Sequence, residues 1–182
     1  MQNYADSGQN SKNKALCGEF GSHVMASAIK MAENNSCMKR IVASPTAGSC
    51  GVVPAVLLNY EKMENIPEQT MVEALIVAAG IGNVIAERAS IAGAAGGCQA
   101  EIGTSSSMAA GALAYLRGGD EYIVDAAALA MKNMLGLVCD PVGGLVEVPC
   151  VKRNAAGAMN ALCAADMALA GIKSAIDVDK VY

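Results

Sequence analysis

Tryptophan is absent from this chain, and phenylalanine and histidine occur only once each. The 53% of residues that are apolar are therefore mainly alanine, together with Val, Leu, Ile and Met. Such a composition favours closely packed helices, because alanine has the highest helix propensity and small side chains let helix backbones approach. A basic excess is also lacking: 13 Lys and Arg face 17 Asp and Glu. This balance argues against a nucleic-acid partner.

Three further features are missing. No N-terminal segment pairs a basic stretch with an apolar core and a cleavage site, so we expect a cytoplasmic protein. The longest uncharged run, residues 41–60, contains two prolines and two glycines, which argues against a membrane-spanning helix. No repeat or linker divides the 182 residues. We predict a polar N-terminal segment, residues 1–15, and one domain over residues 16–182.

The apolar periodicity and the glycine and proline breaks predict an all-α fold, with cysteine-bearing loops between Ala- and Gly-rich helices. A loop is expected at residues 44–51, and Gly80 and Gly82 are expected to permit close helix packing. Residues 41–60 are expected to start as a loop and to become helical after Pro54, which is acceptable as a first-turn residue. The predicted helices cover residues 14–34, the segment after Pro54, and residues 67–88, 101–117, 120–135 and 150–170.

Cysteine is the one reactive residue type that is plentiful, with seven copies. An odd number without regular pairing fits a reducing compartment better than a disulfide framework. Cys98, Cys139 and Cys150 each lie in a Gly- or Pro-rich break, where backbone amides can turn toward a sulfur. No pair has the CxxC spacing of a ferredoxin or a zinc ribbon, so a metal site would be assembled from distant loops.

The remaining cysteines have simpler interpretations. Cys17, Cys37 and Cys163 lie in helical contexts and are expected to be small buried apolar residues. Cys50 follows the loop at 44–51, and a structural role is favoured there too. Cys98 and Cys150 are instead placed near helix starts, whose unpaired amides and positive dipole end stabilise a thiolate.

Five ordered sequence blocks give a more specific signal than the cysteines alone. The blocks are PTAGS at 45–49, GGCQAE at 96–101, CDPVGG at 139–144, VPCVKRNA at 148–155 and ADMALAGI at 165–172. Together they resemble the alpha, catalytic subunit of iron–sulfur-dependent L-serine dehydratases, from about Leu16 to Val178. The segment that this family carries upstream of Leu16 and its C-terminal continuation are not matched, so a shortened form is expected.

The resemblance implies an ammonia-lyase that converts L-serine to pyruvate and ammonia without pyridoxal phosphate. It implies a 4Fe-4S cluster held by Cys98, Cys139 and Cys150, with one iron left open to act as a Lewis acid on the substrate hydroxyl. The loop residues Thr46, Ala47, Gly48 and Ser49 would bind the substrate carboxylate. A tight structural turn is the alternative interpretation of this loop.

The acid–base residue is not identified by the sequence. His23 lies outside the five blocks, and the family implies that a beta subunit or beta domain contributes to catalysis, in a homo- or hetero-oligomer. Residues that flank the ligand loops could support them: Glu101, Ser105, Ser106, Lys152, Arg153 and Asn154. Two alternatives stay open, an L-cysteine desulfidase-type lyase and a non-catalytic metal-binding subunit.

Overall fold

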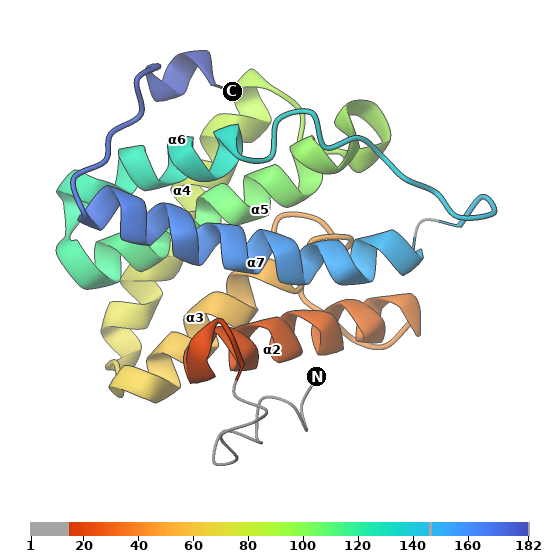
Figure 1. The fold of residues 1–182 in the computed structure, drawn as a ribbon, viewed down its shortest axis with the longest axis horizontal. Helices are drawn as coiled ribbons and strands as arrows, with labels where there is room; N and C mark the ends of the chain where they lie inside the picture. The colour runs from red at the N-terminus through yellow and green to blue at the C-terminus, as the bar shows by residue number, and fades with distance from the viewer. Residues whose placement is uncertain (1–14, 146, 182) are drawn as a thin grey trace.

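A computed structural model describes residues 15–145 and 147–181, and the side chains of residues 147–149 are not described. These residues form six α-helices, two short 3-10 helices and no strand, which confirms the predicted all-α fold (Figure 1). The α-helices are α2 (Gly18–Ser36), α3 (Val52–Glu64), α4 (Glu68–Arg88), α5 (Gly93–Gly118), α6 (Ile123–Lys132) and α7 (Glu147–Leu169). The 3-10 helices are η1 (Asp120–Tyr122) and η2 (Val178–Lys180).

Helix α5 is the centre of the domain. It packs against α3, α4, α6 and α7, and every residue from 102 to 114 is buried. Most of these residues are Ala, Gly or Ser, so neighbouring helices can approach α5 from several directions at once. Figure 1 shows α4 behind α5, with α6 and α7 beside it and α2 and α3 along the lower side. The Ala-rich composition thus builds the close helix packing that the sequence predicts.

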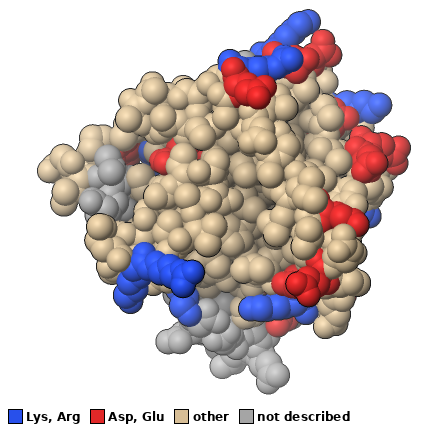
Figure 2. Space-filling model, turned by 180° about the vertical axis from the view of Figure 1, so that it is seen from behind, with Lys and Arg blue, Asp and Glu red and all other residues tan. Residues whose placement is uncertain are grey.

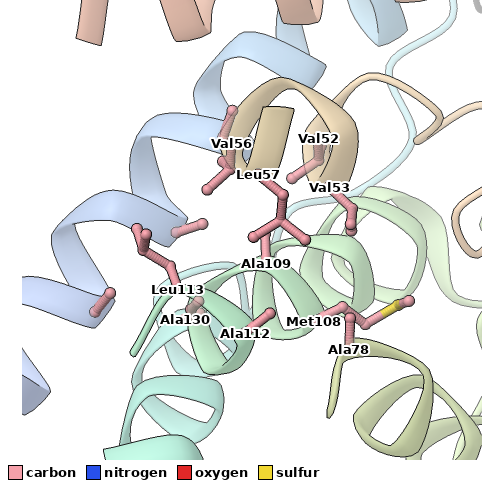
Figure 3. Close-up of a cluster of buried hydrophobic side chains, with 14 of the residues drawn as sticks. Val52, Val53, Val56, Leu57, Ala78, Met108, Ala109, Ala112, Leu113 and Ala130 are labelled. Carbon is pink, nitrogen blue, oxygen red and sulfur yellow. The ribbon is translucent and has the colours of Figure 1, made fainter. Parts of the chain in front are cut away.

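Helix α3 contributes three of the large, fully buried aliphatic side chains. Val52, Val56 and Leu57 are at most 1% exposed and point toward Ala109 and Leu113 of α5 (Figure 3). Burying one such side chain stabilises a fold by about 1.5–3 kcal/mol. This cluster fixes the start of α3, and with it the end of the 44–51 loop.

The serine run in α5 is structural. Ser106 Oγ donates to the carbonyl oxygen of Gly157 on α7 over 2.9 Å, and Ser107 Oγ donates to that of Ala127 on α6 over 2.9 Å. Ser105 Oγ donates to Ile102 within α5. All three side chains are fully buried. Ser106 and Ser107 therefore join α5 to its neighbours, whereas Ser105 is bonded within α5.

Several predicted boundaries differ from the observed ones. Helix α2 starts at Gly18, while Lys14 and the rest of residues 1–14 lie outside the described residues. Helix α3 starts at Val52, two residues before Pro54. A proline is tolerated at this position because the amides of the first helical turn have no intrahelical acceptor. Helix α6 ends at Lys132, and residues 133–136 form turns, with Gly136 at a φ of 86°.

The predicted burial of three cysteines is wrong. Cys17 precedes α2, Cys37 follows it, and both are exposed. Cys163 is exposed on α7, because Ala161, Ala164 and their neighbours fill the inward face of that helix. Cys50 is only 2% exposed, which agrees with the structural role expected for it.

Helix α4 is the one helix of the described residues that is long and apolar enough to cross a membrane by length and composition. A single helix of this kind is weak evidence for membrane insertion. One side of α4 packs inside the domain through Met71, Ala74, Ala78, Gly82 and Ile85. Its other side is exposed.

Candidate metal and substrate site

Cys98 and the Cys139 loop are brought together by a glycine. Gly97 kinks α5 with a φ of 71°, a left-handed conformation that favours glycine. A Cβ at Gly97 would lie 3.1 Å from the Cys139 amide nitrogen and 3.2 Å from Val138 Cα. The next amide, that of Gln99, donates to the carbonyl of Leu137 over 2.7 Å. The backbone before Cys98 thus packs directly on the backbone before Cys139.

Arg153 joins the first turns of α7 to these two segments. Its Nη1 donates to Cys98 Sγ over 2.8 Å and to the Val138 carbonyl over 2.7 Å. Its Nη2 lies 3.4 Å from Asp140 Oδ2. Arg153 follows Cys150 by three residues, about one helical turn. The three predicted ligands therefore lie at one end of the helical bundle.

The three thiols differ in accessibility and in their electrostatic surroundings. Cys98 is buried, Cys150 is partly buried and Cys139 is exposed. The pKa of the Cys150 thiol is raised to about 11, mainly by burial and then by negative charge on Cys98, Glu101 and Cys139. The positive charge of Arg153 partly opposes this increase. Cys150 thus lies within electrostatic reach of both other thiols, and a cationic group among them would favour all three thiolates.

Three thiolate donors are the ligand type that an iron–sulfur cluster uses. Among residues 15–145 and 147–181, no three His, Cys, Asp or Glu side chains come close enough to hold one metal ion. In an iron–sulfur cluster each cysteine binds a different iron, so the sulfurs need not converge on one point. Three thiols from three segments are compatible with that arrangement.

Glu101 faces the 44–51 loop. Its Oε1 accepts a hydrogen bond from Thr46 Oγ1 over 2.5 Å. A Cβ at Gly48 would lie 2.6 Å from both carboxylate oxygens, and one at Gly93 would lie 2.9 Å from Oε2. The carboxylate therefore fits between two glycine backbones, and larger residues at these two positions would displace it.

Asn154 ties the same loop to α7. Its side chain is fully buried and donates from Nδ2 to the carbonyls of Gly48 and Cys150, both over 2.8 Å. Its Oδ1 accepts from the amide of Gly51 over 2.9 Å. The loop that follows Pro45 is thus fixed to the helix that carries Cys150.

The side-chain hydroxyl groups of the 44–51 loop form hydrogen bonds within the protein. Thr46 donates to Glu101, and the buried Ser49 hydroxyl lies 3.0 Å from Thr46 Oγ1 and 3.3 Å from the Ser44 carbonyl. In the described part of the chain, the amides of Ala47 and Gly48 donate to no protein acceptor. Of the predicted substrate-binding groups, these amides are the available donors.

A pocket of about 360 Å³ lies where these groups meet. Gly48, Glu101, Cys150 and Asn154 line one part of it, and residues from the end of α2 line the other. It therefore joins the predicted substrate loop to one predicted metal ligand.

Sequence reasoning named Glu101, Arg153 and Asn154 only as neighbours of the ligand loops. The sequence signal for these residues was that they lie within four positions of Cys98 or Cys150. Their hydrogen-bond partners could not be predicted, because these lie far away in the sequence. Lys152 is exposed, in contrast to Arg153. His23 lies in a separate groove with Glu19 and Lys62, outside this site.

Comparison with known proteins agrees with the sequence blocks. The family model described as "Serine dehydratase alpha chain" matches residues 2–182. The chain belongs to this family. It is 51% identical over 182 residues to "Probable L-serine dehydratase, alpha chain" of Bacillus subtilis, covering all of this chain and 59% of that protein. It is 46% identical over 179 residues to "L-serine dehydratase, alpha chain" of Peptoniphilus asaccharolyticus, covering 98% of this chain and 60% of that protein.

Some relatives in the serine dehydratase alpha chain family are much longer than this chain. "L-serine dehydratase" of Streptomyces coelicolor is 46% identical over 159 residues, which make up 85% of this chain and 34% of that protein. The chain spans about three fifths of the two alpha chains. The matched region therefore occurs both in separate alpha chains and within longer polypeptides.

Proposed function

We propose that this chain is the catalytic alpha part of an L-serine dehydratase, which converts L-serine to pyruvate and ammonia. Membership of the serine dehydratase alpha chain family supports this proposal, as do the printed names of relatives at 46–51% identity. The cytoplasm is its proposed location.

The observation that carries the proposal is the contact of one arginine with two of the cysteine segments. Arg153, one turn from Cys150, donates both to Cys98 Sγ and to the backbone next to Cys139. Cys98, Cys139 and Cys150 would hold a 4Fe-4S cluster, and the guanidinium would offset part of its negative charge. When bound, such a cluster with one open iron would supply a Lewis acid for the substrate hydroxyl.

The pocket offers a complementary group for each charge of the serine zwitterion. The amides of Ala47 and Gly48 would bind the carboxylate, as successive backbone N–H groups do in anion-binding loops. The Glu101 carboxylate, which lines the same pocket, would accept the α-ammonium group. Cys150 lies on the same pocket wall, so the substrate hydroxyl would point toward the cysteines.

A beta chain or beta domain is proposed as the source of the group that removes the α-proton. The only histidine, His23, lies in another groove, and Glu101 is assigned to the α-ammonium group. The name "alpha chain" of two relatives and the greater length of the Streptomyces protein support a second component.

The deciding experiment is anaerobic iron and sulfide analysis of reconstituted protein, followed by electron paramagnetic resonance of the reduced sample with and without L-serine. We expect a cluster whose signal shifts with L-serine. A cluster whose signal does not change with L-serine would favour a non-catalytic metal-binding subunit. A larger signal shift with L-cysteine than with L-serine would favour a desulfidase. Absence of a cluster would refute the assignment of the three ligands.

A further inference from the structure

One polar side chain of the pocket beside Cys150 has unused hydrogen-bonding groups. The described lining residues whose side chains carry oxygen or nitrogen are Asn35, Ser36, Glu101 and Asn154. Asn154 bonds to three backbone groups, and Ser36 Oγ donates to a carbonyl of its own helix over 3.0 Å. The Asn35 carboxamide has no hydrogen-bond partner among the described residues, although Asn35 is partly buried. A ligand in the pocket can therefore use it.

The last turn of α2 places Asn35 at the cysteine end of the bundle. Helices α2 and α7 pack together and run antiparallel, so the end of α2 lies beside the first turns of α7 (Figure 1). The Cys50 thiol donates to the Met31 carbonyl over 3.7 Å, and a Cβ at Gly51 would lie 2.5 Å from the Ala28 carbonyl oxygen. Helix α2 is thus packed closely on the segment that follows the candidate substrate loop, which gives Asn35 a defined place in the pocket wall.

The charges around the pocket favour a cation near Asn35. Glu101 is the only charged residue among the described lining residues. Most Lys and Arg side chains visible in Figure 2 lie toward the edges of that face, and the described lining of the pocket contains neither residue type. The C-terminal end of α2 contributes a partial negative charge, whereas the positive N-terminal end of α7 lies on the Cys150 side. The α2 side of the pocket therefore suits an ammonium group better than a carboxylate.

An ammonium group brings three N–H donors into the pocket, and each needs an acceptor when water is displaced. Glu101 Oε1 already accepts from Thr46. A donor left without an acceptor in a closed site costs free energy, so a second acceptor from the pocket wall is required. The Oδ1 atom of Asn35 is a side-chain acceptor that no described residue uses.

We propose that Asn35 binds the α-ammonium group of the substrate through Oδ1, together with the Glu101 carboxylate. This inference rests on the proposed function and adds a substrate-binding residue from α2, outside the five sequence blocks. Asn35 would help to select amino acids over hydroxy acids of the same size. In L-glycerate, for example, a hydroxyl group replaces the ammonium group of L-serine.

The test compares three ligands that all keep the β-hydroxyl: L-serine, ethanolamine, which lacks the carboxylate, and L-glycerate, which lacks the ammonium group. The measurement is the ligand concentration that half-saturates the electron paramagnetic resonance shift of the reduced, reconstituted protein. Asn35→Ala should bind L-serine and ethanolamine roughly tenfold or more weakly, because a hydrogen bond to a charged group is lost. Its affinity for L-glycerate should be unchanged.

Asn34→Ala is the matched control. Asn34 is the neighbouring asparagine of α2 and is also partly buried, but it is not among the lining residues of the pocket. This variant should bind all three ligands as the unmodified protein does. Iron and sulfide analysis should give the same cluster content for both variants and the unmodified protein, and loss of iron in Asn35→Ala would contradict a role confined to substrate binding.

The pattern across the three ligands separates the possible results. Unchanged L-serine affinity in Asn35→Ala would overturn this inference and leave the proposed function standing. Equal weakening for all three ligands would mean that Asn35 only shapes the pocket. Weaker binding of L-serine and L-glycerate with normal binding of ethanolamine would assign Asn35 to the carboxylate instead. An unmodified protein whose signal responds to none of the ligands would refute the proposed function, and this inference with it.

Discussion

The guanidinium of Arg153 lies 2.8 Å from the sulfur of Cys98, although 55 residues separate them in the sequence. The same group donates to the Val138 carbonyl, one residue before Cys139. One side chain of α7 therefore holds the two other cysteine segments in place. This relationship makes Arg153 the residue whose substitution tests the site most directly.

Arg153→Gln should lower the iron content of the reconstituted protein, because the hydrogen bonds to Cys98 and Val138 are weakened and a positive charge is lost. Removal of such supporting contacts typically costs 10–100-fold in metal affinity. Arg153→Lys keeps the positive charge but loses the two-pronged hydrogen bonding of the guanidinium. Its iron content should lie between those of the unmodified protein and Arg153→Gln. Lys152→Gln, at the exposed neighbouring position, is the control and should bind iron normally.

Cys98→Ala, Cys139→Ala and Cys150→Ala should each lose the cluster, as judged by iron and sulfide analysis and by the visible absorption of the reconstituted protein. Cys17→Ala, Cys37→Ala and Cys163→Ala should retain it, although these three thiols are exposed and free. Normal iron content in any of the first three variants would remove that residue from the ligand set.

Gly97→Ala should also prevent cluster binding, because its Cβ would press on the Cys139 amide at 3.1 Å and force the loop away. Gly119→Ala is a matched control, since Gly119 has a φ of 93° and no neighbour within 4 Å of an added Cβ. Both variants carry the roughly 1–3 kcal/mol strain of placing an alanine in a backbone region that is essentially restricted to glycine. Equal loss of iron in both would show that backbone strain, not the contact with Cys139, is responsible.

Asn154→Ala should lower the free energy of unfolding by about 3 kcal/mol, measured by urea denaturation, because it leaves the buried Gly51 amide and Gly48 carbonyl without partners. Asn59→Ala removes an amide that donates to Ser27 Oγ and the Ala55 carbonyl in a less buried place, and should cost about 1 kcal/mol. A similar cost for both would mean that the Asn154 contacts add nothing specific to the loop.

Glu101→Gln should weaken L-serine binding about tenfold or more, since a neutral amide attracts an ammonium group less strongly than a carboxylate does. The measurement is the L-serine concentration that half-saturates the electron paramagnetic resonance shift. Glu87→Gln, at an exposed position on α4, is the control. Unchanged L-serine affinity in Glu101→Gln would exclude Glu101 as the ammonium partner.

Much of the fold could be predicted from local sequence. Alanine content and apolar periodicity indicate helices, and glycine and proline breaks delimit them, because these are properties of short segments. Helix ends were less accurate: α3 begins at Val52, two residues before Pro54. The burial of Cys17, Cys37 and Cys163 was mispredicted, because Cys17 and Cys37 lie just beyond the two ends of α2 and Cys163 lies on the outward face of α7.

The sequence by itself determined the all-α class and the family, since these depend on composition, periodicity and ordered motifs. Of the three cysteines expected in breaks between helices, only Cys139 lies in a loop, while Cys98 follows the Gly97 kink inside α5 and Cys150 lies in α7. Only the tertiary structure decided that Arg153 contacts Cys98, that Asn154 fixes Gly48 and that Glu101 lies against the 44–51 loop. Each of these contacts joins residues 50 or more positions apart. Long-range contacts of this kind arise from the packing of α5, α7 and the loops between them, and no local pattern of residues encodes them.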